Sequence, residues 1–321
     1  MARCLVVSGG AGFIGSNTVK LSLTTGLFDA IFVLDNLYSG LLENLPSTDR
    51  VKAIVIDVAE GLERVEKLLK GYGQVWILHL AAIVSVDEAY RDPINTIRVN
   101  VMGTANLLEL ARRVDAQKFV YASSVAVYGE PEYLPIDEEH PLKPANLYGA
   151  TKLMGEQLVR QYGEAYGLDY VNLRYFNVYG PNMRAGPYAG VVYKFITGIL
   201  KKGEITIYGD GSQTRDFIYV EDVAHANLKA LTATATGTYN IGTGIETSVK
   251  RLAQEVINAI HVVTGKRPHV KVQYAPPRKG DVKRSQADNS KARDRLNWTP
   301  KTSLGSGLVK TVGWLLARIQ A

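Results

Sequence analysis

Short apolar runs alternate with longer segments of helical periodicity through the first half of the chain. The apolar, β-branched runs predict strands over Cys4–Val7, Ile31–Leu34, Ala53–Ile56, Val75–Leu78, Lys118–Tyr121 and Tyr170–Leu173. The segments between them predict helices over Phe13–Thr24, Gly61–Leu69, Pro93–Val114 and Leu147–Tyr166. Strands that alternate with helices in this way form a parallel sheet with helices on both faces. The pattern therefore predicts an α/β protein with a doubly wound parallel sheet.

After Tyr175 the alternation ends, and loops rich in Gly, Pro and Asn separate the helical segments. Helices are predicted over Val191–Lys201, Val220–Leu231, Val249–Thr264 and Leu304–Ala317. No internal repeat and no low-complexity tract accompanies them. This half of the chain is therefore expected to form a second lobe that is rich in loops.

Length and composition place the chain among folded, soluble proteins. Its 321 residues, at about 150 residues per domain, suggest two domains or one doubly wound domain with a satellite. Apolar residues make up 46% of the chain and charged residues 21%. The longest nearly apolar stretch, Val75–Val86, is shorter than the roughly 20 residues of a membrane-spanning helix. Because the first strand begins near Arg3, no signal peptide is expected before it, and the expected location is the cytoplasm.

Charge, cysteine and histidine content narrow the chemistry further. The single cysteine, Cys4, cannot form an internal disulfide and is expected to be a buried apolar residue. The net charge of +6 is spread along the chain, which suits an anionic small molecule as well as nucleic acid. The five histidines show no metal-ligand spacing, so no metal site is expected. The sequence has no G-x-S-x-G elbow and no P-loop, so it lacks the usual nucleophile of acyl transfer and the usual phosphate cradle of phosphoryl transfer. Of the reaction classes considered, hydride transfer remains.

A glycine-rich segment, GGAGFIG from Gly9 to Gly15, joins the first predicted strand to the first predicted helix. One glycine permits the tight turn, one lets a pyrophosphate approach the backbone N–H groups at the helix start, and one lets the helix pack closely on the strand. The spacing alone is weak, but its position between strand and helix predicts a dinucleotide site.

Asp35 ends the second predicted strand, twenty residues after Gly15. A carboxylate there can accept hydrogen bonds from both hydroxyls of an adenosine ribose and repel a 2′-phosphate. No arginine follows in the segment Asn36–Gly40. These residues predict NAD rather than NADP, although a turn residue at a strand end is the simpler alternative for Asp35.

Tyr148 and Lys152 lie four residues apart at the start of a predicted helix, so they share one face and the ammonium can approach the phenol. Ser123 and Ser124 end the fifth predicted strand, where an open α/β sheet places its ligand. A nearby ammonium and the positive nicotinamide would favour the phenolate of a residue whose ordinary pKa is near 10. Ser124, Tyr148 and Lys152 are therefore the predicted catalytic residues, with Tyr148 as the general base.

Seven segments occur in the order found in the extended short-chain dehydrogenase/reductase family, and the chain resembles its nucleotide-sugar epimerases and dehydratases over nearly its whole length. The segments are Gly9–Gly15, Asp35–Leu37, His79–Ala82, Ser123–Gly129 with VYG at its end, Tyr148–Lys152, Arg174–Asn177, and Gly209–Gly211 leading to Arg215–Phe217. The resemblance implies a Rossmann domain over residues 1–178, completed by about 215–243. Residues 179–214 and 244–321 would then form a smaller α/β lobe that binds a nucleotide sugar.

The resemblance also implies roles for individual residues. The residues that it implies for NAD are Gly9, Gly12, Phe13, Ile14, Gly15, Asp35, Asn36, Ser39, Gly40, Asp57, Val58, Leu80, Ala81, Ala82, Asn100, Tyr148, Lys152 and Tyr175, with Asp57 as the adenine contact. Those that it implies for the substrate are Ser124, Tyr148, Asn177, Val191, Val192, Tyr208, Arg215, Arg278, Asp281 and Ser285. The two arginines suit a diphosphate, because each guanidinium can bind one phosphate in a fork. A UDP-sugar substrate and a homodimer are implied as partners, with no nucleic acid and no membrane.

The residues after Ser124 favour one member of this family. The 4,6-dehydratases that the chain resembles carry Asp-Glu there, whereas this chain has Val125-Ala126, and the Glu typical of the sugar-acid decarboxylases is missing too. The resemblance therefore points to 4-epimerisation through a transient 4-keto sugar.

At Ser285, relatives confined to plain hexoses tend to have Tyr, so the N-acetylated sugars are expected to fit as well, unless Ser285 is an ordinary loop serine. One alternative is a dehydratase or reductase of the same family. A less favoured alternative is a dinucleotide-sensing binding protein.

Overall fold

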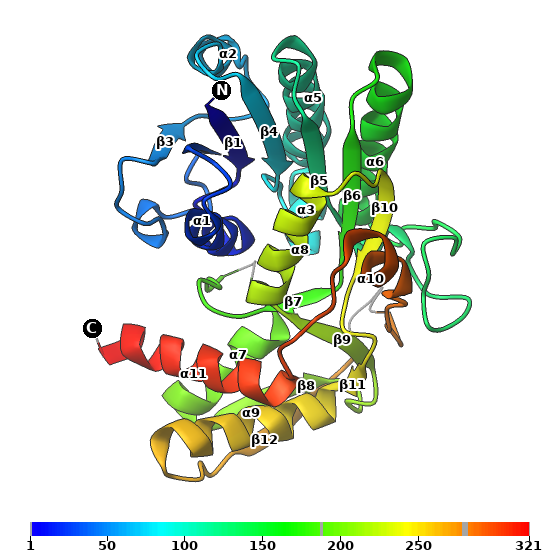
Figure 1. The fold of residues 1–321 in the computed structure, drawn as a ribbon. Coiled ribbons are helices and arrows are strands. Elements are labelled where there is room, and N and C mark those ends of the chain that lie inside the picture. The colour runs from blue at the N-terminus through cyan, green and yellow to red at the C-terminus, as the bar shows by residue number, and fades with distance from the viewer. Residues whose placement is uncertain (1, 187–188, 278–281, 321) are drawn as a thin grey trace.

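The computed structural model describes residues 2–186, 189–277 and 282–320. Its centre is a parallel sheet of seven strands in the order β10-β6-β5-β4-β1-β2-β3 (Figure 1). The strands are β1 Arg3–Ser8, β2 Ala30–Asp35, β3 Val51–Val55, β4 Gln74–His79, β5 Lys118–Ser124, β6 Tyr170–Tyr175 and β10 Gly237–Ile241. The α/β class with a parallel, Rossmann-type sheet is confirmed, and each of the six predicted strands is present.

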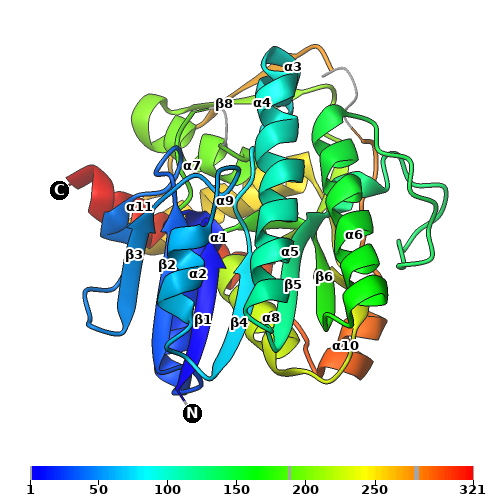
Figure 2. The ribbon, with the colours of Figure 1, turned by 90° about the horizontal axis from the view of Figure 1, so that it is seen from above.

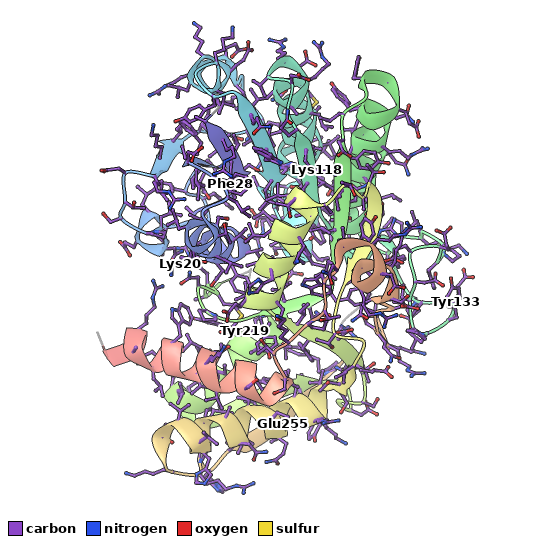
Figure 3. The ribbon with its side chains drawn as sticks, viewed as in Figure 1. Lys20, Phe28, Lys118, Tyr133, Tyr219 and Glu255 are labelled. Atoms are coloured by element: carbon purple, nitrogen blue, oxygen red, sulfur yellow. The ribbon has the colours of Figure 1, made fainter. Side chains whose placement is uncertain are left out.

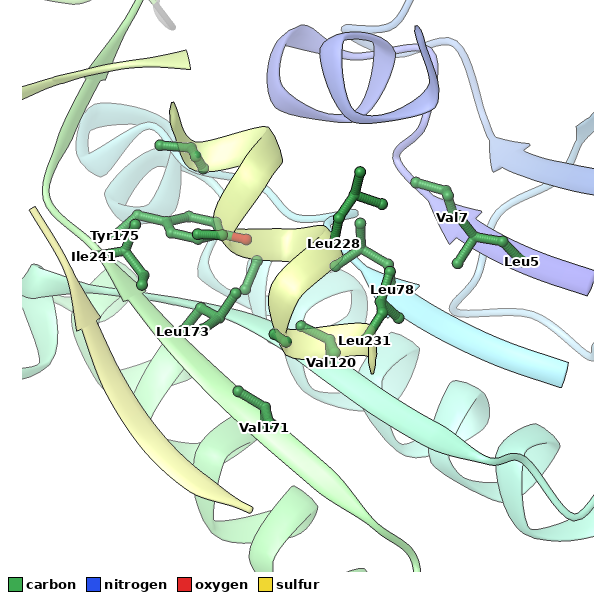
Figure 4. Close-up of a cluster of buried hydrophobic side chains, with 14 of the residues drawn as sticks. Leu5, Val7, Leu78, Val120, Val171, Leu173, Tyr175, Leu228, Leu231 and Ile241 are labelled. Carbon is green, nitrogen blue, oxygen red and sulfur yellow. The ribbon is translucent and has the colours of Figure 1, made fainter. Parts of the chain in front are cut away.

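Helices cover both faces of this sheet, as Figure 2 shows from above. The helices on one face are α2 Glu63–Leu69, α5 Gly103–Arg113 and α6 Leu147–Tyr166, and those on the other are α1 Phe13–Thr25, α8 Val220–Thr232 and α10 Ser290–Leu296. Figure 4 shows the core under α8, where Leu228 and Leu231 face Leu78, Val120 and Val171 of three neighbouring strands. Burial on both faces explains why strands such as β1, β2 and β4 are mostly apolar, whereas β6 alternates because Asn172 and Arg174 lie between its apolar residues.

The segment predicted as one helix over Pro93–Val114 is divided in the structure. It comprises α4 Pro93–Ile97, a turn of π-helix over Arg98–Met102, and α5. A short helix that was not predicted, α3 Val86–Arg91, precedes it, and the Ser85 hydroxyl accepts a hydrogen bond from the Glu88 N–H at its start. The π-helical turn inserts one extra residue, and π-bulges of this kind are frequent at functional sites.

The second lobe has its own core and two small sheets. Its strands are β7 Asn177–Tyr179, β8 Glu204–Tyr208, β9 Thr214–Tyr219, β11 Glu246–Ser248 and β12 Lys271–Ala275, and its helices are α7 Val191–Lys202, α9 Val249–Thr264 and α11 Leu304–Gln320. The strands pair as β11-β9-β7 and β12-β8. Tyr219, labelled in Figure 3, stacks edge-on against Tyr179 beside α11. The helices agree with the prediction, whereas the short strands were not predicted.

The chain crosses between the two halves more than once. α8 and β10 return to the central sheet after β9, and β10 pairs with β6. Ala292, Leu296 and Trp298 also pack in the core beside α8, although the sequence assigned residues 244–321 to the second lobe. The division into domains at the predicted residues therefore stays a proposal.

Within the part of the chain that the structure describes, no helix combines the length and apolarity that crossing a bilayer demands.

Candidate functional site

A cavity of about 440 Å³ opens at the carboxyl ends of the central strands. It lies beside β1 and β4, where the order of the strands reverses, which is the ligand position of open α/β sheets. The predicted residues that line it are Gly9, Gly12, Phe13, Ile14, Gly15, Asp35, Asn36, Ser39, Asp57, Val58, Leu80, Ala81, Ala82, Ser124, Tyr148, Lys152 and Tyr175. The structure thus brings the predicted cofactor and catalytic residues to one cavity.

The turn between β1 and α1 leaves backbone exposed to the cavity. Gly9 has a φ of +67°, and a Cβ on it would lie 2.8 Å from the backbone N of Ala81. A Cβ on Gly15 would overlap the carbonyl oxygen of Gly9, so α1 packs tightly on the turn. Gly12 precedes the first turn of α1, whose N–H groups favour an anion. These contacts fit the pyrophosphate of a dinucleotide.

Asp35 is held at the end of β2 by backbone donors. Its Oδ2 accepts a hydrogen bond from the Ala11 N–H at 3.0 Å and its Oδ1 accepts one from the Leu37 N–H at 2.9 Å. Burial raises the pKa of this carboxyl, while both hydrogen bonds oppose that effect. Gly40 does not line the cavity but leaves room for the carboxylate, because a Cβ on it would lie 2.6 Å from Oδ1. The carboxylate is therefore fixed in the place where an adenosine ribose is expected.

At the end of the cavity near β3, Asp57 is paired with an arginine that was not predicted. Arg98 donates a hydrogen bond to the carboxylate of Asp57 at 2.8 Å, and both residues line the cavity. Arg98 begins the π-helical turn, so this pairing depends on the tertiary structure and has no sequence motif. Arg184, which was also not predicted, lines the cavity and donates a hydrogen bond to the carbonyl oxygen of Ser39.

The catalytic residues come from the end of β5 and the start of α6. The Ser124 hydroxyl accepts a hydrogen bond from the Ala126 N–H at 3.2 Å, in the short 3₁₀ turn Val125–Val127. Asn146 caps α6 by accepting a hydrogen bond from the Gly149 N–H, which fixes the turn that carries Tyr148. Lys152 Nζ donates to the carbonyl oxygen of Ala122 at 2.8 Å. The backbone of β5 therefore anchors the ammonium that the sequence placed next to the phenol.

Burial sets the proton affinities of these groups. It raises the pKa of Tyr148, and a hydrogen bond with Ser124 opposes the effect. It lowers the pKa of the Lys152 ammonium to about 7, opposed by the charge of Glu156. Burial therefore outweighs the effect expected from Lys152, and the lowered phenol pKa that the sequence predicts is not found. When bound, the positive charge of a nicotinamide would favour the phenolate in addition to Lys152.

A buried ion pair lies directly behind the catalytic residues and was missed by the sequence analysis. The Arg174 guanidinium donates two hydrogen bonds to the carboxylate of Glu156, at 2.9 and 2.7 Å. The Ser123 hydroxyl donates to the same carboxylate, and Arg174 also donates to the Tyr128 hydroxyl. An arginine within an apolar strand pattern requires a buried acidic partner, which is the signal that could have indicated this pair.

Apart from Ser124 and Tyr148, the predicted substrate residues do not line the cavity but lie in the second lobe and the segments packed on it. Asn177 stands between Phe176 and Val178, which line the cavity, and Val191 and Val192 follow Gly190, which also lines it. Tyr208 ends β8, and Arg215 lies on β9. The Asn177 Oδ1 and the Ser285 hydroxyl oxygen are buried and have no hydrogen-bond partner among the described residues. Arg278 and Asp281 lie outside the described residues.

Two further groups that the sequence singled out, Asn100 and His79, do not line the cavity. Asn100 does not line the cavity but lies behind its wall, where it hydrogen-bonds the backbone of Ile83. His79 is buried and paired with Ser8 and Thr104, as a residue of the core. Across residues 2–186, 189–277 and 282–320, no three His, Cys, Asp or Glu side chains come together as a metal site.

Comparison with known proteins supports this interpretation. Residues 6–311 match the family described as GDP-mannose 4,6 dehydratase. The UDP-glucose 4-epimerase of Mycolicibacterium smegmatis is 38% identical over 315 residues, which cover 96% of each chain. A UDP-N-acetylglucosamine 4-epimerase from Methanobrevibacter ruminantium, solved with UDP-N-acetylmuramic acid, is 34% identical with a TM-score of 0.90 over 99% of both chains. The UDP-glucose 4-epimerase of Thermus thermophilus, solved with NAD, is 38% identical with a TM-score of 0.86 over 98% of this chain and 99% of that one.

Other similar proteins are named for different reactions. The UDP-glucuronic acid decarboxylase 1 of Arabidopsis thaliana is 35% identical over 323 residues, which cover 98% of this chain and 70% of that protein. Nucleotide-sugar chemistry is common to all these names, whereas the individual reaction differs among them.

Proposed function

Because this chain belongs to the family of GDP-mannose 4,6 dehydratase and the extended short-chain dehydrogenase/reductases, with NAD as its cofactor, we propose that it interconverts UDP-hexoses at C4. One observation carries the proposal. Ser124, Tyr148 and Lys152 line the cofactor cavity, whereas the two positions after Ser124 are apolar. Val125 packs in an apolar cluster, so no carboxyl group at these positions can serve the elimination of water.

The carboxylate behind this strand end does not supply that missing acid. Glu156 is buried and bound by Arg174 and Ser123, so its oxygens are occupied by hydrogen bonds. Among the described residues, the site therefore has groups for one proton transfer and no second pair of acid and base. A reaction that removes and restores one proton and one hydride at the same carbon needs no more than this.

In the proposed reaction, Tyr148 takes the proton of the sugar O4 hydroxyl and later returns it. Ser124 shares the hydrogen bond to that oxygen, and Lys152 stabilises the phenolate from its anchored position on β5. When bound, NAD supplies a reversible hydride acceptor, and Asp35 with the turn at Gly9 would hold it. Loss of a proton from O4 and a hydride from C4 leaves a 4-keto sugar. This sugar must rotate in the site, so that the hydride returns to the opposite face of C4.

The second lobe is proposed to bind the UDP moiety. Asn177 and Ser285 support this, because a buried polar atom without a partner in the protein is costly unless a ligand or water completes its hydrogen bonding. Ser285 is 3% exposed and lies in the segment that packs on β9 beside Arg215. A serine at this position, smaller than the tyrosine of the hexose-restricted relatives, supports an acetamido group at C2 of the sugar, as the resemblance implies for the N-acetylated pair.

The experiment presents four nucleotide sugars separately to the purified protein: UDP-glucose, UDP-galactose and their two N-acetylated counterparts. Proton NMR follows the sugar, and absorbance near 340 nm follows NADH. We expect both pairs to interconvert without net NADH. Steady accumulation of NADH, or a product altered at C6, would overturn the proposal in favour of a dehydrogenase or a dehydratase.

Replacement of Ser285 tests the sugar range. Ser285→Tyr should lose the acetylated pair by about 5- to 150-fold relative to the plain pair, because overpacking costs roughly 1–3 kcal/mol. Ser285→Ala is the matched control, since it removes the hydroxyl without adding volume, and it should keep both pairs. If the tyrosine variant handles the acetylated sugars as well as wild type does, Ser285 does not determine the sugar range.

A decarboxylase is the second candidate, since a relative named for that reaction is 35% identical over nearly the whole chain. UDP-glucuronic acid distinguishes it. Release of carbon dioxide with formation of a UDP-pentose would favour this candidate, and the apolar Val125-Ala126 pair leads us to expect none.

A further inference from the structure

A chain of buried hydrogen bonds begins beneath the wall of the cofactor cavity. The Ser8 hydroxyl oxygen lies 3.2 and 3.3 Å from the backbone N atoms of Leu80 and Ala81, both of which line the cavity. Since Ser8 accepts from these two N–H groups, its own proton is donated elsewhere. The partner is Nδ1 of His79, 2.7 Å from the Ser8 oxygen.

This donation fixes the tautomer of the imidazole. With Nδ1 as an acceptor, the ring proton is on Nε2, which lies 2.9 Å from the Thr104 hydroxyl oxygen. Burial, with a smaller contribution from the charge of Lys152, lowers the pKa of His79 well below its usual value, so the ring is neutral. Thr104 in turn donates to the carbonyl oxygen of Asn100 at 2.6 Å.

The π-helical turn continues the chain to the catalytic helix. The Asn100 side chain accepts from the Ile83 N–H at 2.8 Å and donates to the Ile83 carbonyl at 3.0 Å, which fixes the cavity wall beyond Ala81. It also donates to the Thr151 hydroxyl at 2.9 Å. Thr151 donates to the carbonyl oxygen of Tyr148 at 2.8 Å. One series of bonds therefore runs from the cofactor wall to the residue proposed as the base.

We propose that His79 and Thr104 are positioning residues, which hold the cofactor wall and the helix carrying Tyr148 in one fixed relation. They do not touch the cavity themselves. Ser8, Thr104 and Thr151 are each fully buried, so no water competes for these bonds. Loss of one bond would let the wall and the catalytic turn move apart, and small displacements at such sites are costly to both binding and turnover.

The test is a pair of isosteric and conservative changes at Thr104. Thr104→Val keeps the shape of the side chain but leaves both His79 Nε2–H and the Asn100 carbonyl without this partner, whereas Thr104→Ser retains the hydroxyl. We expect Thr104→Val to weaken NAD binding about 10-fold and to lower kcat by about 10- to 100-fold at saturating ligands, as for a misplaced catalytic group. Thr104→Ser should stay close to wild type. Calorimetry on NAD-free protein gives the NAD affinity.

Thr311→Val is the matched control. Thr311 is fully buried in α11, where its hydroxyl donates to the Gly307 carbonyl four residues earlier at 2.7 Å, as Thr104 does to Asn100. Both valine variants lose a buried bond within a helix, so both should unfold at a lower urea concentration. Only Thr104→Val should lose NAD affinity and kcat.

Equal NAD affinity and equal kcat in the two valine variants would overturn the proposal, as would failure of Thr104→Ser to restore them. If Thr104→Val does not fold, Thr151→Val against Thr151→Ser tests the same series at its other end with the same expected results. The kcat measurement rests on the proposed function, whereas the NAD measurement does not. A protein that lacks epimerase activity but shows the NAD effect would refute the function alone.

Discussion

Replacing Lys152 by methionine removes a buried charge while keeping most of the aliphatic side chain. Lys152 is only 3% exposed, and desolvation lowers its pKa from 10.5 to about 7 in the folded protein. In the unfolded chain the ammonium is in water and keeps its ordinary proton affinity. Between pH 7 and 10.5 the unfolded state therefore binds more protons than the folded state, and the free energy of unfolding must rise with pH.

The size of this effect follows from the pKa difference. The full penalty for holding the ammonium in the folded protein, present below pH 7, is on the order of 5 kcal/mol at about 1.4 kcal/mol per pH unit. Between pH 6 and pH 9 roughly half of that penalty should disappear as the folded Lys152 loses its proton. Urea unfolding of NAD-free protein should show this rise in wild type beyond any rise in Lys152→Met. The variant should also be the more stable of the two at pH 6.

Lys20→Met is the control, because Lys20 is exposed on α1 and its ammonium stays in water (Figure 3). Its stability should change with pH in parallel with wild type. If wild type and Lys152→Met change in parallel instead, the ammonium of Lys152 is not desolvated in the way that its burial implies.

Other changes address the base, the buried ion pair and the cofactor. Tyr148→Phe should lower turnover of the nucleotide sugar at least about 100-fold, as for a positioned general base, while the protein still binds NAD; near-normal turnover by NMR would rule out this base. Arg174→Met should cost about 3–5 kcal/mol in urea unfolding at pH 7, because it leaves the Glu156 carboxylate buried without its cation, and a loss below about 1 kcal/mol would contradict the pairing. Since Asp35 should exclude a 2′-phosphate, chromatography of denatured protein should find NAD released, and bound NADP would contradict its proposed role.

The helices that the sequence predicts best are those with local signals at both ends. α6 and α9 have the predicted bounds, because Asn146 and Ser248 cap their starts and glycines in the left-handed conformation end them. The interrupted helix over residues 93–113 could not be predicted, since its π-helical turn is held by tertiary bonds from Asn100 to Ile83 and Thr151. Local periodicity carries no information on such contacts.

The missed strands have a different cause. In β12, Val272 and Tyr274 alternate with Lys271 and Gln273, but the signal spans only five mostly exposed residues. Its partner β8 lies more than sixty residues earlier in the chain, so local sequence does not indicate the pairing. For the site, short motifs with fixed spacing located the glycine turn and Lys152. Glu156 resembles any acidic residue on an amphipathic helix until its contact with Arg174 is known.

The position of β10 in the central sheet has a consequence for synthesis of the chain on the ribosome. β6 pairs with β5 on one side and with β10 on the other, and β10 is made only at residues 237–241. Until then a nascent chain has an open edge at β6, and the apolar residues that α8 covers in the finished protein, such as Val171, are also bare until residue 232 is made. Such edges readily pair with other chains. The sheet that binds the cofactor is therefore completed only after the first part of the second lobe, residues 179–214, has been made. A translational arrest before residue 237 would release a fragment prone to aggregate.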